Sequence, residues 1–330
     1  MTKTVLVTGG AGYVGSHCCR AFAEAGWRVA VFDNLSRGWR DFARFGSLIE
    51  GDLMDRSAIQ GALEAVKPDA VAHFAAYAYV GESVSNPGAY YANNVIGTHT
   101  LLEAMRTTGV ERIVFSSTCA TYGVPTQVPI DETHPQAPIN PYGRSKLMVE
   151  RMLADYSAAY GMAHVALRYF NAAGADPSGE LGERHEPETH VIPLAIAAAM
   201  RGDDSFQIFG DDFDTRDGTA VRDYIHVADL ADAHLKALAY LREGGASDVF
   251  NLGTGVGTTV AEIAGAVERR SGRPLHRTVV GRREGDPPAL VAAADKARRV
   301  LGWTPTQSDI DNIVETAWLW HERDSLRQNA

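Results

Sequence analysis

The sequence predicts an α/β protein with a doubly wound parallel sheet and a smaller, interleaved C-terminal α/β part. Apolar strand-like runs alternate with helical patterns over the first half of the chain, a glycine-rich turn follows the first run, and this rhythm changes after Asn171. Alternating β and α segments favour parallel strands covered by helices on both faces. With 330 residues, the chain can form one large domain or two joined ones.

The individual elements follow from the period of the apolar residues. In the first half we expect strands at Val5–Thr8, Val29–Asp33, Leu48–Glu50, Ala70–Phe74, Arg112–Ser116 and Val165–Tyr169. The helices expected between them are Gly15–Glu24, Arg56–Val66, Tyr90–Arg106 and Ser145–Tyr160. Further on we expect a strand at Val249–Leu252 and helices at Val191–Met200, Val227–Leu241, Val260–Arg270 and Asp309–His321. Residues 171–190, rich in glycine, proline and acids, are expected to form an ordered loop over a site.

Composition excludes several classes of protein. A formal net charge of −10 argues against a nucleic-acid partner held by broad electrostatics. No run approaches the ~18 apolar residues of a membrane span, so we expect a cytoplasmic protein without a membrane partner. Three cysteines cannot form a disulfide framework in a chain of this size, and their spacing does not resemble a zinc site.

One short stretch, "HEPETH", has a weak likeness to a metal-binding motif. His185 and His190 are separated by Pro187, which forbids the helix that would place both imidazoles on one face. We therefore expect a loop there and no metal.

The glycine-rich turn predicts a dinucleotide site. Gly10, Gly12 and Gly15 have the G-x-G-x-x-G spacing, and Gly9 extends it to G-x-x-G-x-x-G. Glycine permits the tight turn and a close approach of the backbone to a pyrophosphate, which the N-terminus of the next helix can bind. The second strand then ends on Asp33, whose carboxylate can accept hydrogen bonds from an adenosine ribose and would repel a 2′-phosphate. The pattern favours NAD over NADP.

The chemistry is predicted from a Y-x-x-x-K pair. Tyr142 and Lys146 would lie on one face of a helix, where an ammonium near the phenol, together with a nicotinamide cation, favours the phenolate. Such a tyrosine can act as a base near neutral pH. Hydroxyl residues 116–118 end the fifth strand, at the edge where α/β sheets place reacting groups, and we choose Thr118 to bond the reacting oxygen.

Together these stretches resemble the extended short-chain dehydrogenases/reductases, and within them the UDP-glucose (UDP-galactose) 4-epimerases. The resemblance is carried by "VTGGAGYVGSH", "FDNLSRG", "GDLMD", "HFAAYAYVGESV", "NNVIGT", "FSSTCATYG", "PYGRSKLMVE", "LRYFNAAGADPSGELGE", "DGTAVRDYIHVADLADAH", "NLGTGVG" and "RREGD". It covers almost the whole chain. It implies an isomerase with tightly bound NAD and a UDP-sugar substrate, and a homodimer built on helices 90–106 and 145–160.

The resemblance also implies a division of the chain and a role for each matching residue. Residues 1–171, with about 219–255 returning, would form a Rossmann-type NAD-binding domain, and 172–330 mainly a cap that binds the UDP-sugar. The catalytic residues would be Thr118, Tyr142 and Lys146. NAD would be held by Gly9, Gly12, Tyr13, Val14, Gly15, Asp33, Asn34, Leu35, Ser36, Arg37, Gly38, Asp52, Leu53, Phe74, Ala75, Ala76, Tyr77, Ala78, Asn93, Tyr142, Lys146 and Phe170. The substrate would be held by Thr118, Tyr142, Asn171, His190, Val191, Gln207, Ile208, Phe209, Arg222, Arg283, Asp286 and Leu290.

Three positions depart from the pattern of the family. Ala78 stands where several relatives have a lysine near the cofactor, and His190 replaces a common asparagine near the uridine. Leu290 falls at the position that gates the far end of the sugar pocket, and its intermediate size leaves open whether N-acetylated UDP-hexosamines are accepted.

Other functions on the same fold remain as alternatives. A 4,6-dehydratase needs an acid pair after the threonine, and Cys119 and Ala120 stand there instead. A UDP-xylose/UDP-L-arabinose 4-epimerase would use the same chemistry with a different pocket for C6. A non-catalytic NAD-sensing protein would be expected to lose Tyr142 or Lys146, and both are present.

Overall fold

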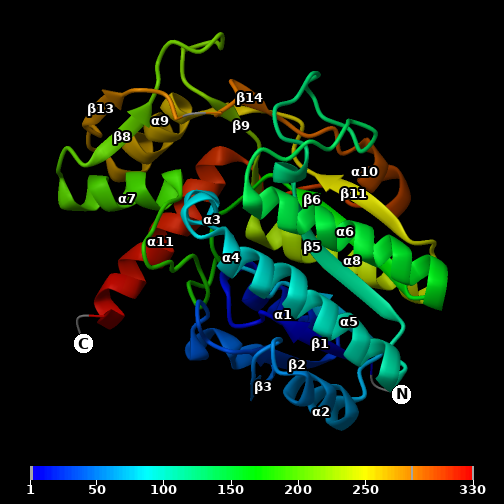
Figure 1. Cartoon of the computed structure of the whole chain (residues 1–330). Coiled ribbons are helices and arrows are strands. Elements are labelled where there is room, and N and C mark those ends of the chain that lie inside the picture. Colours follow the sequence, from blue (N-terminus) through cyan, green and yellow to red (C-terminus); the bar gives the residue numbers. More distant parts are fainter. Residues whose placement is uncertain (1–2, 284, 329–330) are drawn as a thin grey trace.

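The computed structural model describes residues 3–283 and 285–328 of the chain (Figure 1). Its centre is a seven-stranded sheet in the order β11-β6-β5-β4-β1-β2-β3, in which all neighbouring strands are parallel. These strands are β1 (Thr4–Thr8), β2 (Arg28–Asp33), β3 (Ser47–Glu50), β4 (Ala70–His73), β5 (Arg112–Thr118), β6 (Ala163–Tyr169) and β11 (Asp248–Leu252). The predicted α/β fold with a parallel sheet is confirmed.

Helices cover both faces of this sheet. Along β1, Val5 and Val7 point into one buried cluster and Leu6 into another, as the period of a strand requires. The first cluster is closed by α1 (Tyr13–Glu24) and α8 (Val227–Arg242), and the second by α2 (Arg56–Val66), α5 (Gly97–Thr108) and α6 (Pro141–Tyr160). Because the sheet is apolar on both sides, the chain is doubly wound.

The order of the strands determines where a ligand can bind. From β1 the chain builds outward through β2 and β3 on one side, then returns to β4 and continues through β5 and β6 on the other. The strand order therefore reverses between β1 and β4. In such sheets, ligands bind in the crevice beyond the carboxyl ends of the strands at this point.

The helix expected at Tyr90–Arg106 differs in its details. Two short helices, α3 (Val80–Ser85) and α4 (Pro87–Tyr90), precede a π-helical stretch, η2 (Tyr91–Ile96), which continues into α5. Within η2, the Asn94 amide accepts a hydrogen bond from the Tyr77 N–H (2.8 Å) and donates one to the Tyr77 carbonyl (3.0 Å). A wider turn at this place thus fixes the loop that follows β4, which periodicity alone could not reveal.

A second core lies beside the central sheet. Buried residues of α7 (Val191–Arg201), α9 (Val260–Ser271) and α11 (Ile310–Gln328) form it, together with β8 (Phe206–Phe209), which pairs with β13 (Arg277–Val280). The remaining short elements are η1 (Arg40–Phe45), η3 (Cys119–Thr121), β7 (Asn171–Ala173), β9 (Val221–Arg222), β10 (Tyr224–His226), β12 (Thr258–Thr259), β14 (Ala289–Leu290) and α10 (Asp295–Leu301). In Figure 1 this half carries the later part of the chain, while α8 and β11 return to the central sheet.

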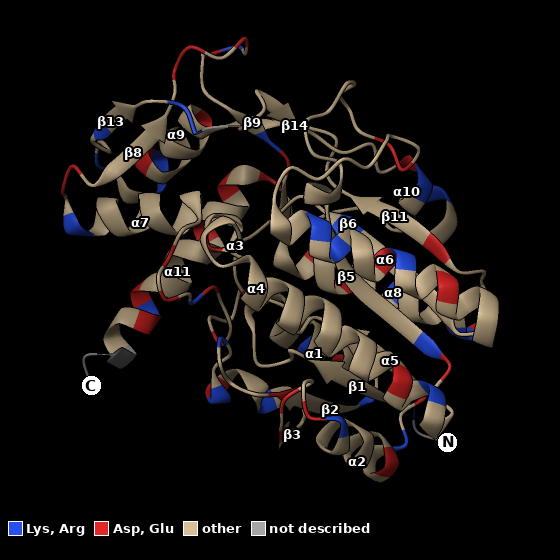
Figure 2. Cartoon of the chain, in the orientation of Figure 1, with Lys and Arg blue, Asp and Glu red and all other residues tan. Residues whose placement is uncertain are grey.

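The surface carries both signs of charge. Figure 2 shows acidic and basic residues interspersed along α5 and α6. Within the described ranges, none of the helices combines the length and apolarity needed to cross a bilayer. The three cysteines are buried and unpaired, and Cys18 and Cys19 lie inside α1 as expected.

Candidate functional site

A cavity of about 1110 Å³ opens at the reversal point of the strand order. Residues at or just beyond the carboxyl ends of five strands line it: Gly9 after β1, Asp33 of β2, Phe74 after β4, Thr118 of β5 and Phe170 after β6. The sheet thus brings together segments that are far apart in the sequence. From the other side, the cavity is closed by residues of the second half, including Arg222 and Arg283.

The glycine turn at one end of the cavity has the geometry that a dinucleotide requires. Gly9 has a φ of +74°, and a side chain there would place its Cβ 2.5 Å from the Ala75 nitrogen. A Cβ on Gly15 would clash with the Gly9 carbonyl oxygen. Helix α1 begins after Gly12 with no side-chain cap and no acid in its first turn, so its first N–H groups and dipole remain available to an anion. The residues present therefore fit a bound pyrophosphate.

Asp33 is held rigidly at the end of β2. Its carboxylate accepts hydrogen bonds from the Ala11 N–H (3.0 Å) and the Leu35 N–H (2.9 Å). Burial raises the pKa of Asp33, and the two N–H groups oppose that rise. A carboxylate fixed in this way can accept from ribose hydroxyls without reorganising.

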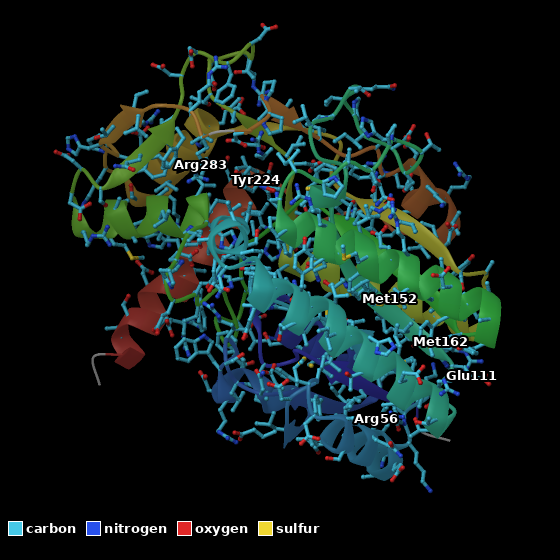
Figure 3. All side chains as sticks on the ribbon, viewed as in Figure 1. Arg56, Glu111, Met152, Met162, Tyr224 and Arg283 are labelled. Atoms are coloured by element: carbon cyan, nitrogen blue, oxygen red, sulfur yellow. The ribbon has the colours of Figure 1, made fainter. Side chains whose placement is uncertain are left out.

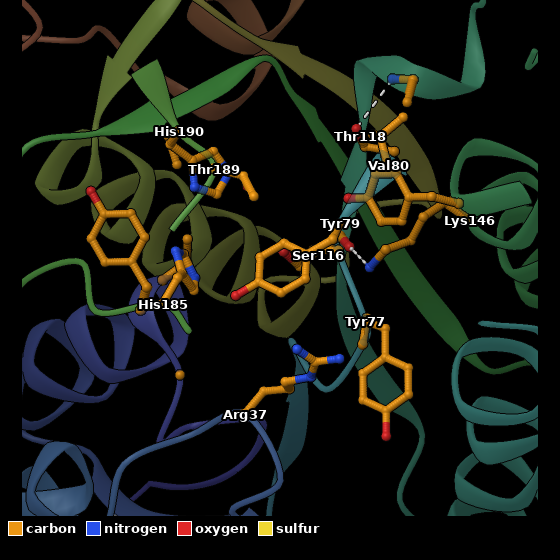
Figure 4. A pocket seen from close by; sticks show the side chains of 18 of the residues that line it. Arg37, Tyr77, Tyr79, Val80, Ser116, Thr118, Lys146, His185, Thr189 and His190 are labelled. Atoms are coloured by element: carbon orange, nitrogen blue, oxygen red, sulfur yellow. Dashed lines mark hydrogen bonds between the residues drawn. The ribbon is translucent and has the colours of Figure 1, made fainter. Parts of the chain in front are cut away.

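Arg37 crosses the cavity instead of pointing outward. Its guanidinium forms an ion pair with Glu82 (2.6 Å) and lies 5.3 Å from the ring centroid of Tyr77 and 5.1 Å from that of Tyr79. Figure 4 shows Arg37 below Tyr79 and beside Tyr77. The carboxylate of Glu82 thus offsets the charge of Arg37 within the cavity lining.

The predicted catalytic residues lie together and are buried. Asn140 caps α6 by accepting from the Gly143 N–H (2.8 Å), so that the helix begins at Pro141 and places Tyr142 and Lys146 one turn apart. The Lys146 ammonium donates to the Ser116 carbonyl (2.8 Å, Figure 4) and lies 6.0 Å from the Tyr142 ring centroid. Thr118 lines the same wall, and its hydroxyl lowers the pKa of Tyr142.

Burial is the largest influence on the pKa values of both Tyr142 and Lys146. It raises the pKa of Tyr142, and the hydroxyl of Thr118 opposes the rise. It also lowers the pKa of Lys146 to about 7, against the attraction of Glu150. Burial thus disfavours the ammonium that we expected to favour the phenolate, and a further positive charge beside Tyr142 would favour its phenolate form.

The opposite wall carries the arginines. Arg222 donates to the Asp286 carboxylate (2.5 Å) and to the Pro287 carbonyl (2.9 Å). The Arg283 guanidinium lies 3.9 Å from the ring centroid of Phe209, which positions it over β8. Figure 3 labels Arg283 and Tyr224 in the upper half of the molecule. Strands β9 and β14 pair Arg222 with Leu290, so one ladder positions both on the cavity wall.

Most residues predicted for the site line this single cavity, but four do not. Leu35, Gln207, Ile208 and Phe209 lie outside its lining. Ile208 is buried in the second core, and Phe209 supports Arg283 from behind. The resemblance places residues 207–209 at the substrate, but in the structure strand β8 lies behind the cavity lining and reaches it through the contact of Phe209 with Arg283.

The cavity also has lining residues that sequence reasoning missed. Tyr224 of β10, which pairs with Asn171 of β7, lines it, and so do Tyr79, Glu183 and His185. Tyr224 stands two residues after Arg222, and the strand period places both on one face. The two-residue spacing from Arg222 is the feature of the sequence that could have identified Tyr224 as a lining residue.

The predicted loop around Pro187 is confirmed, yet it does not separate the two histidines. Glu183, His185, Glu188 and His190, hereafter the His–Glu cluster, have donor atoms within 4.8 Å of one another. Burial opposes protonation of His185 and His190, but the two carboxylates outweigh it and raise the pKa of His185 to about 9. The absence of a helix does not keep the two imidazoles apart, because the loop brings the four side chains together without one.

This geometry defines an α/β enzyme that uses a dinucleotide: a phosphate-binding turn, a ribose-binding acid and a tyrosine–lysine pair share one cavity. The profile of the NAD dependent epimerase/dehydratase family matches residues 5–253, and the chain belongs to this family.

Individual relatives are similar over nearly their whole length. A UDP-glucose 4-epimerase of Rhizobium leguminosarum bv. trifolii is 57% identical over 97% of this chain and 98% of its own. The crystal structure of UDP-glucose 4-epimerase from Brucella ovis in complex with NAD has a TM-score of 0.94, with 51% identity, over 96% of this chain and 98% of that one. The enzyme from Bifidobacterium longum in complex with NAD+ and UDP has a TM-score of 0.91, with 36% identity, over 98% and 99%.

Proposed function

We propose that this protein is a UDP-hexose 4-epimerase, which interconverts UDP-glucose and UDP-galactose by inverting the configuration at C4 of the sugar. One observation carries the proposal: Tyr142, Lys146 and Thr118 share a cavity with the glycine turn. The same cavity is lined on its opposite wall by Arg222 and Arg283. Relatives that bear this activity in their names support it over almost the whole chain.

NAD would be held along the turn and the ends of β1, β2 and β4. The uncapped first turn of α1 would hold the pyrophosphate, Asp33 the adenosine ribose, and Lys146 the nicotinamide ribose. When bound, NAD supplies a reversible hydride acceptor and a positive charge beside Tyr142. This charge favours the phenolate that burial alone disfavours.

The chain's own groups manage the proton and the sugar. Tyr142 takes the proton of the 4-hydroxyl, and Thr118, which neighbours the phenol, hydrogen-bonds the same sugar oxygen. C4 gives up its hydride at the same time, for which bound NAD would be the acceptor, so that a 4-keto sugar results. This sugar turns within the cavity and presents its other face, where C4 would take the hydride back and Tyr142 returns the proton. Arg222 and Arg283 hold the diphosphate, since a guanidinium suits phosphate oxygens. Firm hold on UDP and a loose hold on the sugar permit this rotation.

The proposal extends to the organisation of the protein. Residues 1–171, with about 219–255, would be the NAD-binding domain, and 172–330 mainly the cap that binds the UDP-sugar. A homodimer through η2, α5 and α6 is favoured by the exposed apolar side chains of Ile96, Met148 and Tyr160. Light scattering checks the dimer. A cytoplasmic location is favoured by three free thiols.

Replacing Tyr142 with Phe tests the proposed base. Tyr142→Phe removes one hydroxyl from a buried ring, so we expect kcat to fall by roughly 10²–10⁴-fold, the contribution of a positioned acid or base. Tyr240→Phe, at a partly buried tyrosine of α8 outside the cavity lining, is the matched control and should keep full activity. The measurement is epimerisation of UDP-galactose at saturating substrate, with bound NAD determined for both variants. Wild-type turnover in Tyr142→Phe would refute the assignment.

An isotope experiment tests the hydride route separately. Because the hydrogen of C4 is borrowed and returned within the site, product formed in D₂O should contain no deuterium at C4. Mass spectrometry or NMR of the recovered UDP-sugar measures this. Solvent deuterium at that carbon would mean exchange through a carbanion, and the scheme would fail.

The wall residue Leu290 favours a second, broader specificity. Leu290 is half-buried, lines the cavity and packs against the buried cluster of Cys119, Tyr122 and Phe170. An aliphatic side chain of this size leaves more room than a ring would, which favours acceptance of N-acetylated UDP-hexosamines. A panel of UDP-galactose, UDP-N-acetylgalactosamine and UDP-xylose, compared by kcat/KM, distinguishes a hexose enzyme, a broad one and a pentose enzyme.

A further inference from the structure

The His–Glu cluster gathers four metal-binding side chains at one edge of the cavity. The His190 Nδ1 atom lies 2.7 Å from Glu183 Oε1 and 3.1 Å from Glu188 Oε1. The His185 Nδ1 atom lies 3.1 Å from Glu183 Oε1 and 3.7 Å from Glu188 Oε2. Both imidazoles therefore direct the same ring nitrogen toward the same two carboxylates, and their ring centroids are 5.0 Å apart.

The cluster is held in place from several sides. The Glu183 carboxylate is buried, and its own carbonyl accepts from the Trp320 indole (2.9 Å). The next carbonyl, that of Arg184, accepts from the Trp39 indole (3.0 Å). Glu188 Oε1 accepts from the N–H groups of Thr189 (2.7 Å) and His190 (2.8 Å), which leaves Oε2 toward His185. The donor atoms thus stand on a backbone that is already fixed.

We propose that the His–Glu cluster is a binding site for one divalent transition-metal ion, with Zn²⁺ as the best fit. Donor atoms of a tetrahedral zinc site lie ~3.3–3.5 Å apart, which follows from metal–ligand bonds of ~2.0–2.2 Å. With Glu188 Oε2 as the fourth donor atom, three N–O separations within this set are 2.7, 3.1 and 3.7 Å, which bracket this range. Two imidazoles and two carboxylates are ligands that zinc accepts, and the carboxylates neutralise its two charges.

The position of the cluster gives the ion a structural task. The His185 ring centroid lies 6.2 Å from that of Tyr13, in the first turn of α1, and His190 immediately precedes α7. In Figure 4, His185 and His190 lie across the cavity from Thr118 and Lys146. An ion with four protein ligands would tie the segment 183–190 into one rigid wall between the cofactor turn and the second core. Because Glu183, His185 and His190 line the cavity, an ion can reach them through it.

The test measures metal binding to the NAD-loaded protein after removal of metals with a chelator. Titration with zinc sulfate in a calorimeter should give one site per chain, and elemental analysis after dialysis should give the same stoichiometry. His185→Asn and Glu188→Gln should each weaken zinc binding by at least ~10-fold, since each removes a ligand. His276→Asn is the matched control, because His276 is an exposed histidine outside the cluster.

Crystals soaked in zinc sulfate give a second readout that does not depend on any variant folding. An anomalous-scattering peak among the four donor atoms is the expected result. Zinc binding that is unchanged in both cluster variants, or a peak elsewhere, would overturn the proposal and leave an ion-pair network. Neither readout involves epimerisation, so this proposal and the proposed function can fail separately.

Discussion

Glu150 connects the catalytic helix to the sheet beneath it. It lies one turn after Lys146 on α6, and its carboxylate forms a buried ion pair with Arg168 of β6 (2.6 Å). Ser117 of β5 donates to the same carboxylate (2.5 Å), and Gln136 donates from the following loop (3.0 Å). Through its negative charge, Glu150 also supports the protonated form of Lys146. One residue thus fixes the helix and influences a neighbour that faces the substrate.

Removing Glu150 should be costly. Glu150→Ala leaves the Arg168 guanidinium buried without its counter-ion, so we expect the free energy of unfolding to fall by about 3–5 kcal/mol. Urea denaturation followed by circular dichroism measures the change. Arg269→Ala, which breaks the exposed ion pair with Asp311, should change stability by no more than about 1 kcal/mol. Equal effects of the two substitutions would contradict the importance of burial.

At the scale of single residues, sequence could identify only what short-range patterns contain. Asp33, Tyr142 and Lys146 follow from strand ends and helical spacing, and the cavity includes all three. Glu183 and His185 could not be assigned in this way, because their surroundings are made by Tyr13 and Trp320, which are far away in the chain. Burial likewise decides the pKa of Lys146, and burial depends on tertiary packing.

Among the elements, α2 shows how propensity and capping cooperate. Asp55 caps it by accepting from the N–H groups of Ser57 (2.9 Å) and Ala58 (3.2 Å), and the helix has the bounds expected from its sequence. Most long periodic segments of this kind agree with their expected bounds to within a few residues, but α11 continues to Gln328, seven residues beyond the expected end at His321. Strands β9, β12 and β14 were not, because two residues carry no periodic pattern and exist only through their partners.

Within α2, Gly61 offers a stabilising substitution. A Cβ added there meets no atom within 4 Å, so Gly61→Ala costs no contact and reduces the entropy of the unfolded chain. We expect the free energy of unfolding to rise by about 0.5–1 kcal/mol, measured by urea denaturation. The contrasting substitution is Gly15→Ala in α1, whose Cβ would clash with the Gly9 carbonyl oxygen and should lower NAD affinity. A destabilised Gly61→Ala protein would show that α2 is not a regular helix there.

For the whole molecule, buried neutral histidines link stability to pH. Burial lowers the pKa of His17, His226 and His234 to about 4, and that of His73 to about 3. In the unfolded chain these groups titrate near 6.5. Below pH 6.5 these histidines bind protons in the unfolded state but not in the folded state. The contribution of the neutral histidines to stability is therefore complete above pH 6.5 and is lost as the pH falls toward 4.

We therefore expect acid sensitivity before the carboxylates titrate. Between about pH 6.5 and pH 5, the free energy of unfolding should fall by up to ~1.4 kcal/mol per pH unit for each such histidine. Urea denaturation at several pH values measures the slope. His234→Gln should reduce the slope of the free energy of unfolding against pH by the contribution of one histidine. His276→Asn, at an exposed site, should reduce this slope much less. A slope of zero would show that these rings are protonated in the folded protein.

The central sheet has a consequence for the synthesis of the chain. Its edge strand β11 comes from residues 248–252 and pairs with Val165–Tyr169 of β6, while α8 covers one face. When the first 171 residues have left the ribosome, β6 still exposes an unpaired edge and the apolar face beneath α8 is open to water. The central sheet can therefore reach its final form only after three quarters of the polypeptide has been translated, and a fragment that ends at residue 171 would be prone to aggregate.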